Sequence, residues 1–278
     1  MLVQGNNKIF SYDPNYLCGI SKIQNAIGEG RIVGGKEVVP PHAHPWIVTL
    51  SKYKYEARGK SHGSFGCGGT LVSRKHVLSA AHCARTCDKP KSCWDKPVNW
   101  ATLGDHDKRI NDGEIYVKVT KPFHIHPGAF QPSPPNGGFM YDYVIFVLEC
   151  CVTFNTYIEP ACFPTQPHWS SWSEQWSDHW YNGQMVTVLG WGHTKFQGSN
   201  SATLQSINIS VRNDQYCASR LKMSPSLVDY DRLYLMCASA IPDYDKDACQ
   251  NDSGGKKNTE KSLSDNFGGT IKPYTLNH

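Results

Sequence analysis

The 278-residue sequence lacks long apolar runs, a strong net charge and C-x-x-C cysteine pairs. No apolar run approaches the roughly 20 residues that a membrane-spanning helix needs, so no membrane partner is predicted. The net charge of +4 is small and scattered, which argues against nucleic acid as a partner. The 24 glycines lack the period of three typical of collagen. With 39% hydrophobic and 12% aromatic residues, the composition excludes a disordered chain.

A secretory leader is also missing, because residues 1–16 contain no run of about 7–15 apolar residues. Cysteine, in contrast, is abundant. Eleven scattered cysteines predict a disulfide framework in an oxidising compartment, and no Cys/His quartet has the spacing of a zinc site. We therefore expect a secreted protein whose sequence begins after its signal peptide. An intracellular thiol-rich binding protein is the alternative, and a thiol count under denaturing conditions would separate the two.

Short apolar runs separated by turn residues follow one another after residue 35. They are rich in β-branched and aromatic residues, and several alternate apolar with polar, which predicts an all-β sandwich or barrel. At roughly 100–200 residues per domain, the length fits one large domain or two small lobes. We place the connector between two lobes near residues 164–183. The expected strands lie at residues 46–50, 69–72, 115–119, 143–148, 185–189 and 204–211.

Four short segments carry residue types that nucleophilic catalysis uses. They are Leu-Ser-Ala-Ala-His-Cys at 78–83, Tyr-Asp-Tyr-Val-Ile-Phe at 141–146, Leu-Gly-Trp-Gly at 189–192 and Asp-Ala-Cys-Gln-Asn-Asp-Ser-Gly-Gly at 247–255. Alone, His82 could be a core histidine, Asp142 a turn residue and Asp-Ser-Gly-Gly an ordinary turn. Chance does not explain their joint occurrence downstream of Ile-Val-Gly-Gly at 32–35.

This set resembles the trypsin/chymotrypsin family of serine endopeptidases (peptidase S1) over residues 18–255. The resemblance implies an all-β fold of two antiparallel six-stranded β-barrels. It also implies a catalytic triad in which Ser253 attacks the scissile carbonyl, His82 accepts its proton and Asp142 orients His82. The backbone N–H groups of Asn251 and Ser253 would form the oxyanion hole.

The resemblance extends to activation. It implies that residues 1–31 are a propeptide and residues 32–278 a trypsin-like protease domain. Cleavage between Arg31 and Ile32 would free an α-amino group. This ammonium would pair with Asp252 and order the oxyanion loop, which would release latent activity.

Substrate specificity is implied by Asp247, six residues before Ser253. In the family this position is the floor of the primary specificity pocket, where an aspartate attracts Lys or Arg side chains. Asn251 departs from the family, which normally has glycine there. Because asparagine also has a backbone N–H, the oxyanion donor survives the change.

The cysteines fit the same family. The resemblance implies disulfides between Cys67 and Cys83, between Cys217 and Cys237, and between Cys18 and Cys162. Cys87 and Cys93 flank a short insertion and are expected to pair with each other. No partner is assigned to the adjacent Cys150 and Cys151, and Cys249 lacks the partner that the family would supply.

The chain ends at His278, before the pocket-lining strand and terminal helix that the family has after Asp-Ser-Gly-Gly. We therefore expect a C-terminally truncated form with an incomplete second barrel and no activity as written. The preferred function is a secreted, zymogen-activated endopeptidase that cleaves after Arg or Lys. The alternative is a non-catalytic protease homologue that acts as a binding module, which Asn251 and the departure at Lys256 favour.

No cofactor is expected, and the expected partners are protein substrates, an activating protease and protein inhibitors of proteases. An acidic loop could bind structural calcium, because some members of the family bind calcium there through oxygen ligands. We interpret this loop instead as a solvated acidic turn. Its acidic residues are Asp105, Asp107, Asp112 and Glu114.

Overall fold

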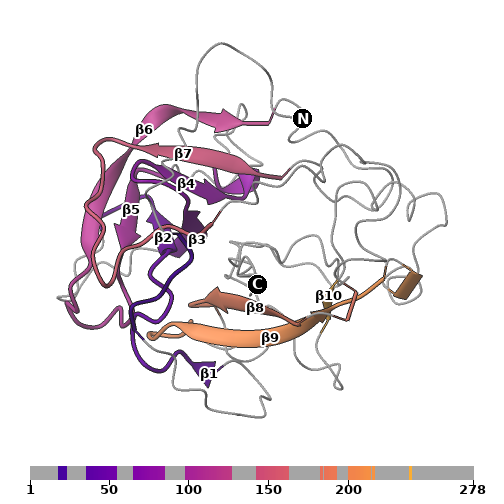
Figure 1. The fold of residues 1–278 in the computed structure, drawn as a ribbon. Helices are drawn as coiled ribbons and strands as arrows, with labels where there is room; N and C mark the ends of the chain where they lie inside the picture. The colour runs from indigo at the N-terminus through magenta and orange to yellow at the C-terminus, as the bar shows by residue number, and fades with distance from the viewer. Residues whose placement is uncertain are drawn as a thin grey trace.

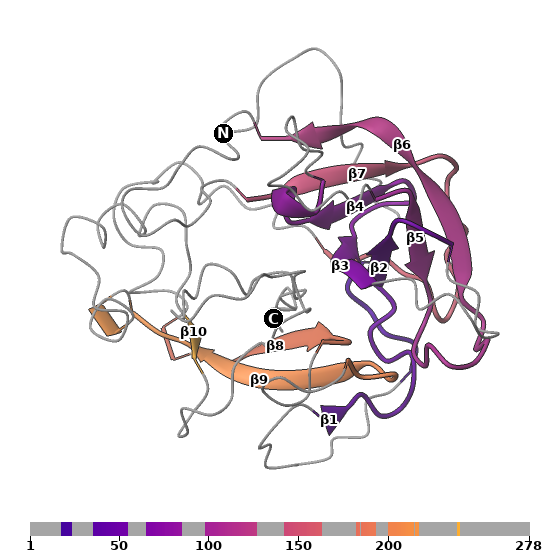
Figure 2. The same cartoon turned by 180° about the vertical axis from the view of Figure 1, so that it is seen from behind.

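The structure is a computed structural model. It describes residues 18–23, 36–54, 65–84, 98–126, 142–162, 182–183, 185–192, 200–213, 215–216 and 238–239. This part of the chain contains ten β-strands and a single 3-10 helix, so the all-β prediction is confirmed. The strands form a closed barrel and a separate four-stranded sheet, which lie beside each other in Figures 1 and 2.

Six antiparallel strands close the barrel, in the order β2-β3-β4-β7-β6-β5. They are β2 (Ile47–Ser51), β3 (Phe65–Leu71), β4 (His76–Ser79), β5 (Trp100–Leu103), β6 (Ile115–Ile125) and β7 (Val144–Leu148). Strand β7 alternates buried and half-buried residues, as a barrel strand with one inward face should. Gly69 allows close packing, because a Cβ there would lie 2.7 Å from Cγ1 of Val77.

Strand β2 differs from β7 because all five of its residues are buried. Val48 and Leu50 point into the barrel core. Ile47 belongs to a second cluster, which also contains Leu189 of the other sheet and, next to the ends of its strands, Trp191 and Leu204. Strand β2 therefore lies between the barrel core and the second cluster, which explains why all five of its residues are buried, Thr49 and Ser51 included.

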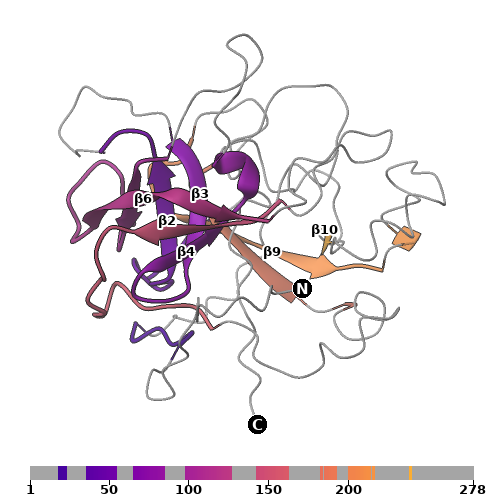
Figure 3. The same ribbon diagram turned by 90° about the horizontal axis from the view of Figure 1, so that it is seen from above.

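The second sheet is built on β9 (Gln205–Val211). It pairs with β1 (Lys36–Glu37), β8 (Met185–Gly190) and β10 (Ala238–Ser239), and all these pairings are antiparallel. Val186 and Val188 of β8 pack against Ile207 and Ile209 of β9 in a core of their own. Seen from above in Figure 3, β9 and β10 run away from the barrel. This sheet holds the described strands of the second lobe.

The loop between β5 and β6 joins the two lobes. Its His106 carbonyl accepts hydrogen bonds from the Trp191 indole N–H and from the Leu204 backbone N–H, both at 3.0 Å. The backbone N–H of Lys108 donates to the carbonyl of Ala202 at 2.9 Å, and Asp107 forms a β-bridge with Thr203. These hydrogen bonds join the loop between β5 and β6 to the second lobe, beside the apolar contacts of β2.

The Lys108 ammonium lies inside this junction, and its side chain is only 3% exposed. It donates to Oδ2 of Asp105 at 3.0 Å and to the hydroxyl of Thr49 at 2.9 Å. It also lies 4.1 Å from the centre of the Trp191 ring, in a cation–π contact. Burial lowers the pKa of Lys108, and the Asp105 carboxylate opposes this shift. The carboxylate of Asp105, the hydroxyl of Thr49 and the indole ring of Trp191 therefore stabilise the ammonium charge.

We predict that Lys108→Met destabilises the protein by about 3–5 kcal/mol, because it leaves the Asp105 carboxylate buried without its cation. The double variant Lys108→Met/Asp105→Asn should recover much of this loss, since it also removes the stranded charge. Urea unfolding followed by circular dichroism measures both. Equal destabilisation of the single and double variants would contradict an ion pair at this site.

Candidate active site

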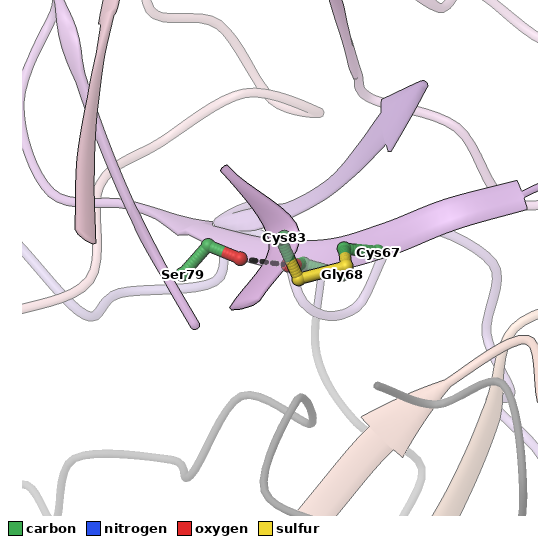
Figure 4. Close-up of a disulfide and its surroundings, with 4 residues drawn as sticks. All are labelled: Cys67, Gly68, Ser79 and Cys83. Carbon is green, nitrogen blue, oxygen red and sulfur yellow. Dashed lines mark hydrogen bonds between the residues drawn. A yellow bond between two sulfur atoms is a disulfide. The ribbon is translucent and has the colours of Figure 1, made fainter. Parts of the chain in front are cut away.

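The segment that carries His82 is held in place by a disulfide and a hydrogen bond. The 3-10 helix η1 (Ala81–Cys83) follows β4, and Cys83 forms a disulfide with Cys67 of β3. Two residues before η1, the hydroxyl of Ser79 donates to the carbonyl of Gly68 at 2.7 Å. Figure 4 shows both links between the end of β4 and β3. They fix the backbone of η1 on both sides of the candidate histidine.

Asp142 lies at the start of the neighbouring strand β7 and is half-buried. Strands β4 and β7 are antiparallel, with Ser79 opposite Val144. Because Ser79 lies three residues before His82 and Val144 two residues after Asp142, the register brings both backbones to the same end of the barrel. Two segments about 60 residues apart in sequence thus meet through strand pairing alone.

The other proposed site residues lie outside the described part of the chain. The serine and its neighbours, the pocket aspartate, the activation junction and two of the four expected disulfides fall there, as does the connector at 164–183. These residues are Arg31, Ile32, Cys87, Cys93, Cys217, Cys237, Asp247, Asn251, Asp252 and Ser253. The structure therefore describes the histidine segment and the aspartate of the predicted triad and leaves its serine as a prediction.

The third sequence segment, at 189–192, has a structural position. Its Trp191 is buried in the junction, where the indole N–H donates to the barrel loop. This residue aligns the two lobes by direct contact.

A second disulfide, between Cys18 and Cys162, ties the N-terminal segment to the barrel. The N–H of Gly19 donates to the carbonyl of Pro160 at 2.8 Å, and the Lys22 ammonium lies 2.6 Å from Oε1 of Glu159. Residues 18–23 are therefore held by one covalent bond and two polar contacts. Both cysteine pairs that the structure describes as bonded are pairs that the family resemblance implied.

The acidic loop is not the solvated turn that the sequence suggested. Asp105 is only 5% exposed and its carboxylate holds the Lys108 ammonium, while the Asp107 carboxylate binds Arg109 at 2.7 Å. One oxygen of Asp112 accepts backbone N–H groups of the loop itself. In this structure, protein cations and backbone N–H groups therefore contact one or both oxygens of Asp105, Asp107 and Asp112. The sequence shows the acidic residues, but it does not show which of them the fold buries.

Two half-buried titratable groups also meet at this loop. The Nε2 atom of His42 lies 3.7 Å from Oδ2 of Asp112, and its ring stacks on Tyr157 with centroids 4.3 Å apart. Burial lowers the pKa of His42 and raises that of Asp112. His42 has a φ of 61°, a conformation uncommon for residues other than glycine. Sequence reasoning missed this contact, since nothing local marks His42 as a partner of the loop.

Comparisons with known proteins agree with this geometry. A family model described as Trypsin matches residues 32–260. The chain is 28% identical over 260 residues to Ovochymase-2 of Mus musculus, covering 91% of this chain and 37% of that protein. It is 28% identical over 239 residues to Venom serine protease Bi-VSP of Bombus ignitus and 29% identical over 242 residues to Proclotting enzyme of Tachypleus tridentatus. Each of these two alignments covers 86% of this chain.

Solved structures of serine proteases share the fold. The Drosophila Grass clip serine protease of the Toll pathway has a TM-score of 0.52 at 23% identity, with 76% of this chain and 54% of that chain covered. Mouse neuropsin has a TM-score of 0.53 at 24% identity, with 81% of both chains covered. The chain belongs to the trypsin family of serine proteases. Members of this family are hydrolases that act on proteins and generally need no cofactor.

The chain spans 58% of the bumblebee protease and 56% of the horseshoe-crab enzyme, and a smaller share of the mouse relative. Among the described residues, no group of three or more His, Cys, Asp and Glu side chains is arranged to hold a metal ion. Over the same residues, the structure contains no helix with the length and hydropathy of a membrane span.

We predict that replacing both Cys67 and Cys83 by alanine lowers the free energy of unfolding by about 3 kcal/mol, the value typical of a loop of roughly 15 residues. The matched control Ser79→Ala, which removes only the hydrogen bond to Gly68, should cost about 0.5–1.5 kcal/mol. Urea unfolding measures the stability. Hydrogen exchange at the backbone N–H of Cys83 and Ala84 should accelerate more in the first variant than in the second. Unchanged exchange there would contradict the assigned role.

Proposed function

We propose that this protein is a serine endopeptidase whose triad consists of Ser253, His82 and Asp142. The observation that carries the proposal is the pairing of β4 with β7, which brings the backbones at His82 and Asp142 to one end of the barrel. Ser253 lies in the Asp-Ser-Gly-Gly segment, inside the matched range 32–260. The proposal requires that the second lobe places Ser253 at the end of the barrel where the backbones at His82 and Asp142 lie.

The chemistry explains the need for three residues. A serine hydroxyl is a weak nucleophile near neutral pH, so His82 would accept the proton of Ser253 as the hydroxyl attacks the carbonyl. His82 would then return the proton to the leaving amine. Asp142 would hold the imidazole in the required tautomer and stabilise its charged form. The cycle restores the enzyme once water has hydrolysed the acyl intermediate.

The developing oxyanion needs donors that are already in place. The backbone N–H groups of Asn251 and Ser253 would supply them, and one such donor is typically worth about 3–4 kcal/mol of the barrier. Asparagine at 251 keeps the N–H of the glycine that the family usually has. Since no metal is required for this step, electrostatic stabilisation by these amides is the main contribution of the site.

We further propose that the protein cleaves after Arg or Lys. Asp247 would lie at the floor of the specificity pocket, where its carboxylate would bind the guanidinium or ammonium of the substrate. A buried charge pair of this kind rejects apolar side chains, because these would leave the carboxylate without a partner.

The test of this specificity is hydrolysis of peptide amides by the activated protein, completed with the C-terminal segment of a trypsin-family relative because the chain as written is expected to be inactive. Peptides with Arg or Lys before the scissile bond should be cleaved and matched Phe or Leu peptides should not. Asp247→Ser should lower kcat/KM for the basic substrates by about 30-fold to 5,000-fold, from a loss of about 2–5 kcal/mol of transition-state binding. Ser253→Ala is the control and should lower the rate of hydrolysis by several orders of magnitude. An unchanged rate in Ser253→Ala contradicts the triad, and equal rates on Arg and Phe peptides contradict the pocket.

Residues 1–31 are proposed as a propeptide and residues 32–278 as the protease domain. Cleavage after Arg31 would free the α-amino group of Ile32 to pair with Asp252 and order the oxyanion loop. The disulfide between Cys18 and Cys162 supports this arrangement, since it would keep the cleaved propeptide attached to the domain. Secretion, an activating protease and protein inhibitors belong to the same proposal.

Limited digestion of the folded protein with trypsin should produce a new N-terminus at Ile32. Without reductant, the fragment that contains residues 18–23 should stay bound to the rest of the chain, because Cys18 is bonded to Cys162. With reductant, or in the Cys18→Ala/Cys162→Ala variant, it should separate. N-terminal sequencing and paired reducing and non-reducing gels measure both effects. Absence of an Ile32 terminus would refute cleavage at this site.

A further inference from the structure

The adjacent cysteines Cys150 and Cys151 are not used by the proposed function. Both are exposed and neither is in a disulfide. They follow directly after β7 and Glu149, in a turn at the surface of the barrel. In an oxidising compartment, exposed thiols without a partner in their own chain are typical sites of bonding to another molecule.

The backbone on either side of the pair is fixed to the barrel. The N–H of Glu149 donates to the carbonyl of Lys118, and the N–H of Val152 donates to the carbonyl of Arg74, both at 2.8 Å. Val152 is buried in the barrel core. The two cysteines therefore lie between two anchors that are three residues apart, and the segment cannot rearrange without breaking sheet contacts.

This anchoring disfavours a bond between the two sulfurs. Consecutive Cα atoms of a trans peptide are about 3.8 Å apart, whereas disulfides usually join Cα atoms about 4.4–6.8 Å apart. Closing Cys150 onto Cys151 would therefore distort a backbone that is held at both ends. The other four described cysteines are already paired, as Cys18–Cys162 and Cys67–Cys83. Within the described chain, neither thiol has a cysteine to bond.

We propose that Cys150 and Cys151 form a surface dithiol that reacts by thiol–disulfide exchange with disulfides outside the chain. The cysteine thiolate attacks one sulfur of a low-molecular-weight disulfide such as glutathione disulfide. A new S–S bond forms to Sγ, the old S–S bond breaks, and the departing thiolate takes up the proton that the cysteine released. The external disulfide is the oxidant. Because the two sulfurs do not bond each other, each carries its own mixed disulfide.

Charged groups of both signs flank the pair, since Glu149 directly precedes Cys150. An Arg74 guanidinium N–H donates to the carbonyl of Val152 at 3.1 Å, which places a cation one residue beyond Cys151. Glutathione disulfide is the probe, and a second copy of the chain is the other source of the same sulfur chemistry.

The test exposes the folded protein to glutathione disulfide, blocks remaining thiols with N-ethylmaleimide and digests without reductant. A protease that cleaves after aromatic residues, here Phe146 and Phe154, releases residues 147–154, whose only cysteines are Cys150 and Cys151. We expect this peptide to carry two glutathionyl groups in the native sequence. It should carry one in Cys150→Ser and one in Cys151→Ser.

The double variant Cys150→Ser/Cys151→Ser is the matched control and should carry none, while its Cys18–Cys162 and Cys67–Cys83 peptides stay intact. Without glutathione, a covalent dimer that the double variant cannot form would support the proposal and identify a second copy as the sulfur source. Three results overturn it: a peptide two hydrogens lighter, with the sulfurs joined; a peptide bonded elsewhere in the same chain; and a peptide unreactive toward both reagents. None of these readouts depends on protease activity.

Discussion

The two-sided burial of β2 is the constraint on which the rest of the structure depends. Its inward residues fill the barrel, and Ile47 on the other face packs against the second sheet. A strand in this position has no face left for water, so every polar group near it needs a protein partner. The Lys108 ammonium meets this need through Asp105, Thr49 and the Trp191 ring. The loop after β5 is consequently determined by both lobes together.

The strand order of the barrel also positions two segments of the candidate site. The barrel order puts β4 beside β7, and this pairing brings the His82 and Asp142 segments together from distant parts of the sequence. The disulfide to Cys67 then limits how far η1 can move from β3. A serine supplied by the second lobe would have to lie within a fraction of an ångström of its required position relative to His82, since small misplacements lower the catalytic rate. In the proposed triad, the docking of the lobes at Trp191 would therefore contribute to the alignment of the serine with the histidine.

Cysteine serves two different purposes in this fold, and position alone separates them. Cys67 and Cys83 are buried, and their Cα atoms lie 6.1 Å apart, within the range of an ordinary disulfide. Cys150 and Cys151 are exposed, and as neighbours in the chain they are too close for one. The first pair stabilises the histidine segment, and the second is free to react with other molecules. All four residues are cysteines, but the distance that the backbone sets between the two members of a pair determines whether they can form a disulfide.

The sequence by itself determined the fold class and the family, because strand alternation and segments such as Ala-Ala-His-Cys are local patterns. It also indicated both disulfides that the structure describes, through resemblance to the family. It failed at the acidic loop: Asp105 was interpreted as part of a solvated turn, but it is buried beside Lys108, whose ammonium lies on Trp191, 83 positions further along the chain. Likewise, only the tertiary structure joined Ser79 to Gly68 and His42 to Asp112. Burial and partner choice are properties of contacts between distant segments, and no local periodicity records them.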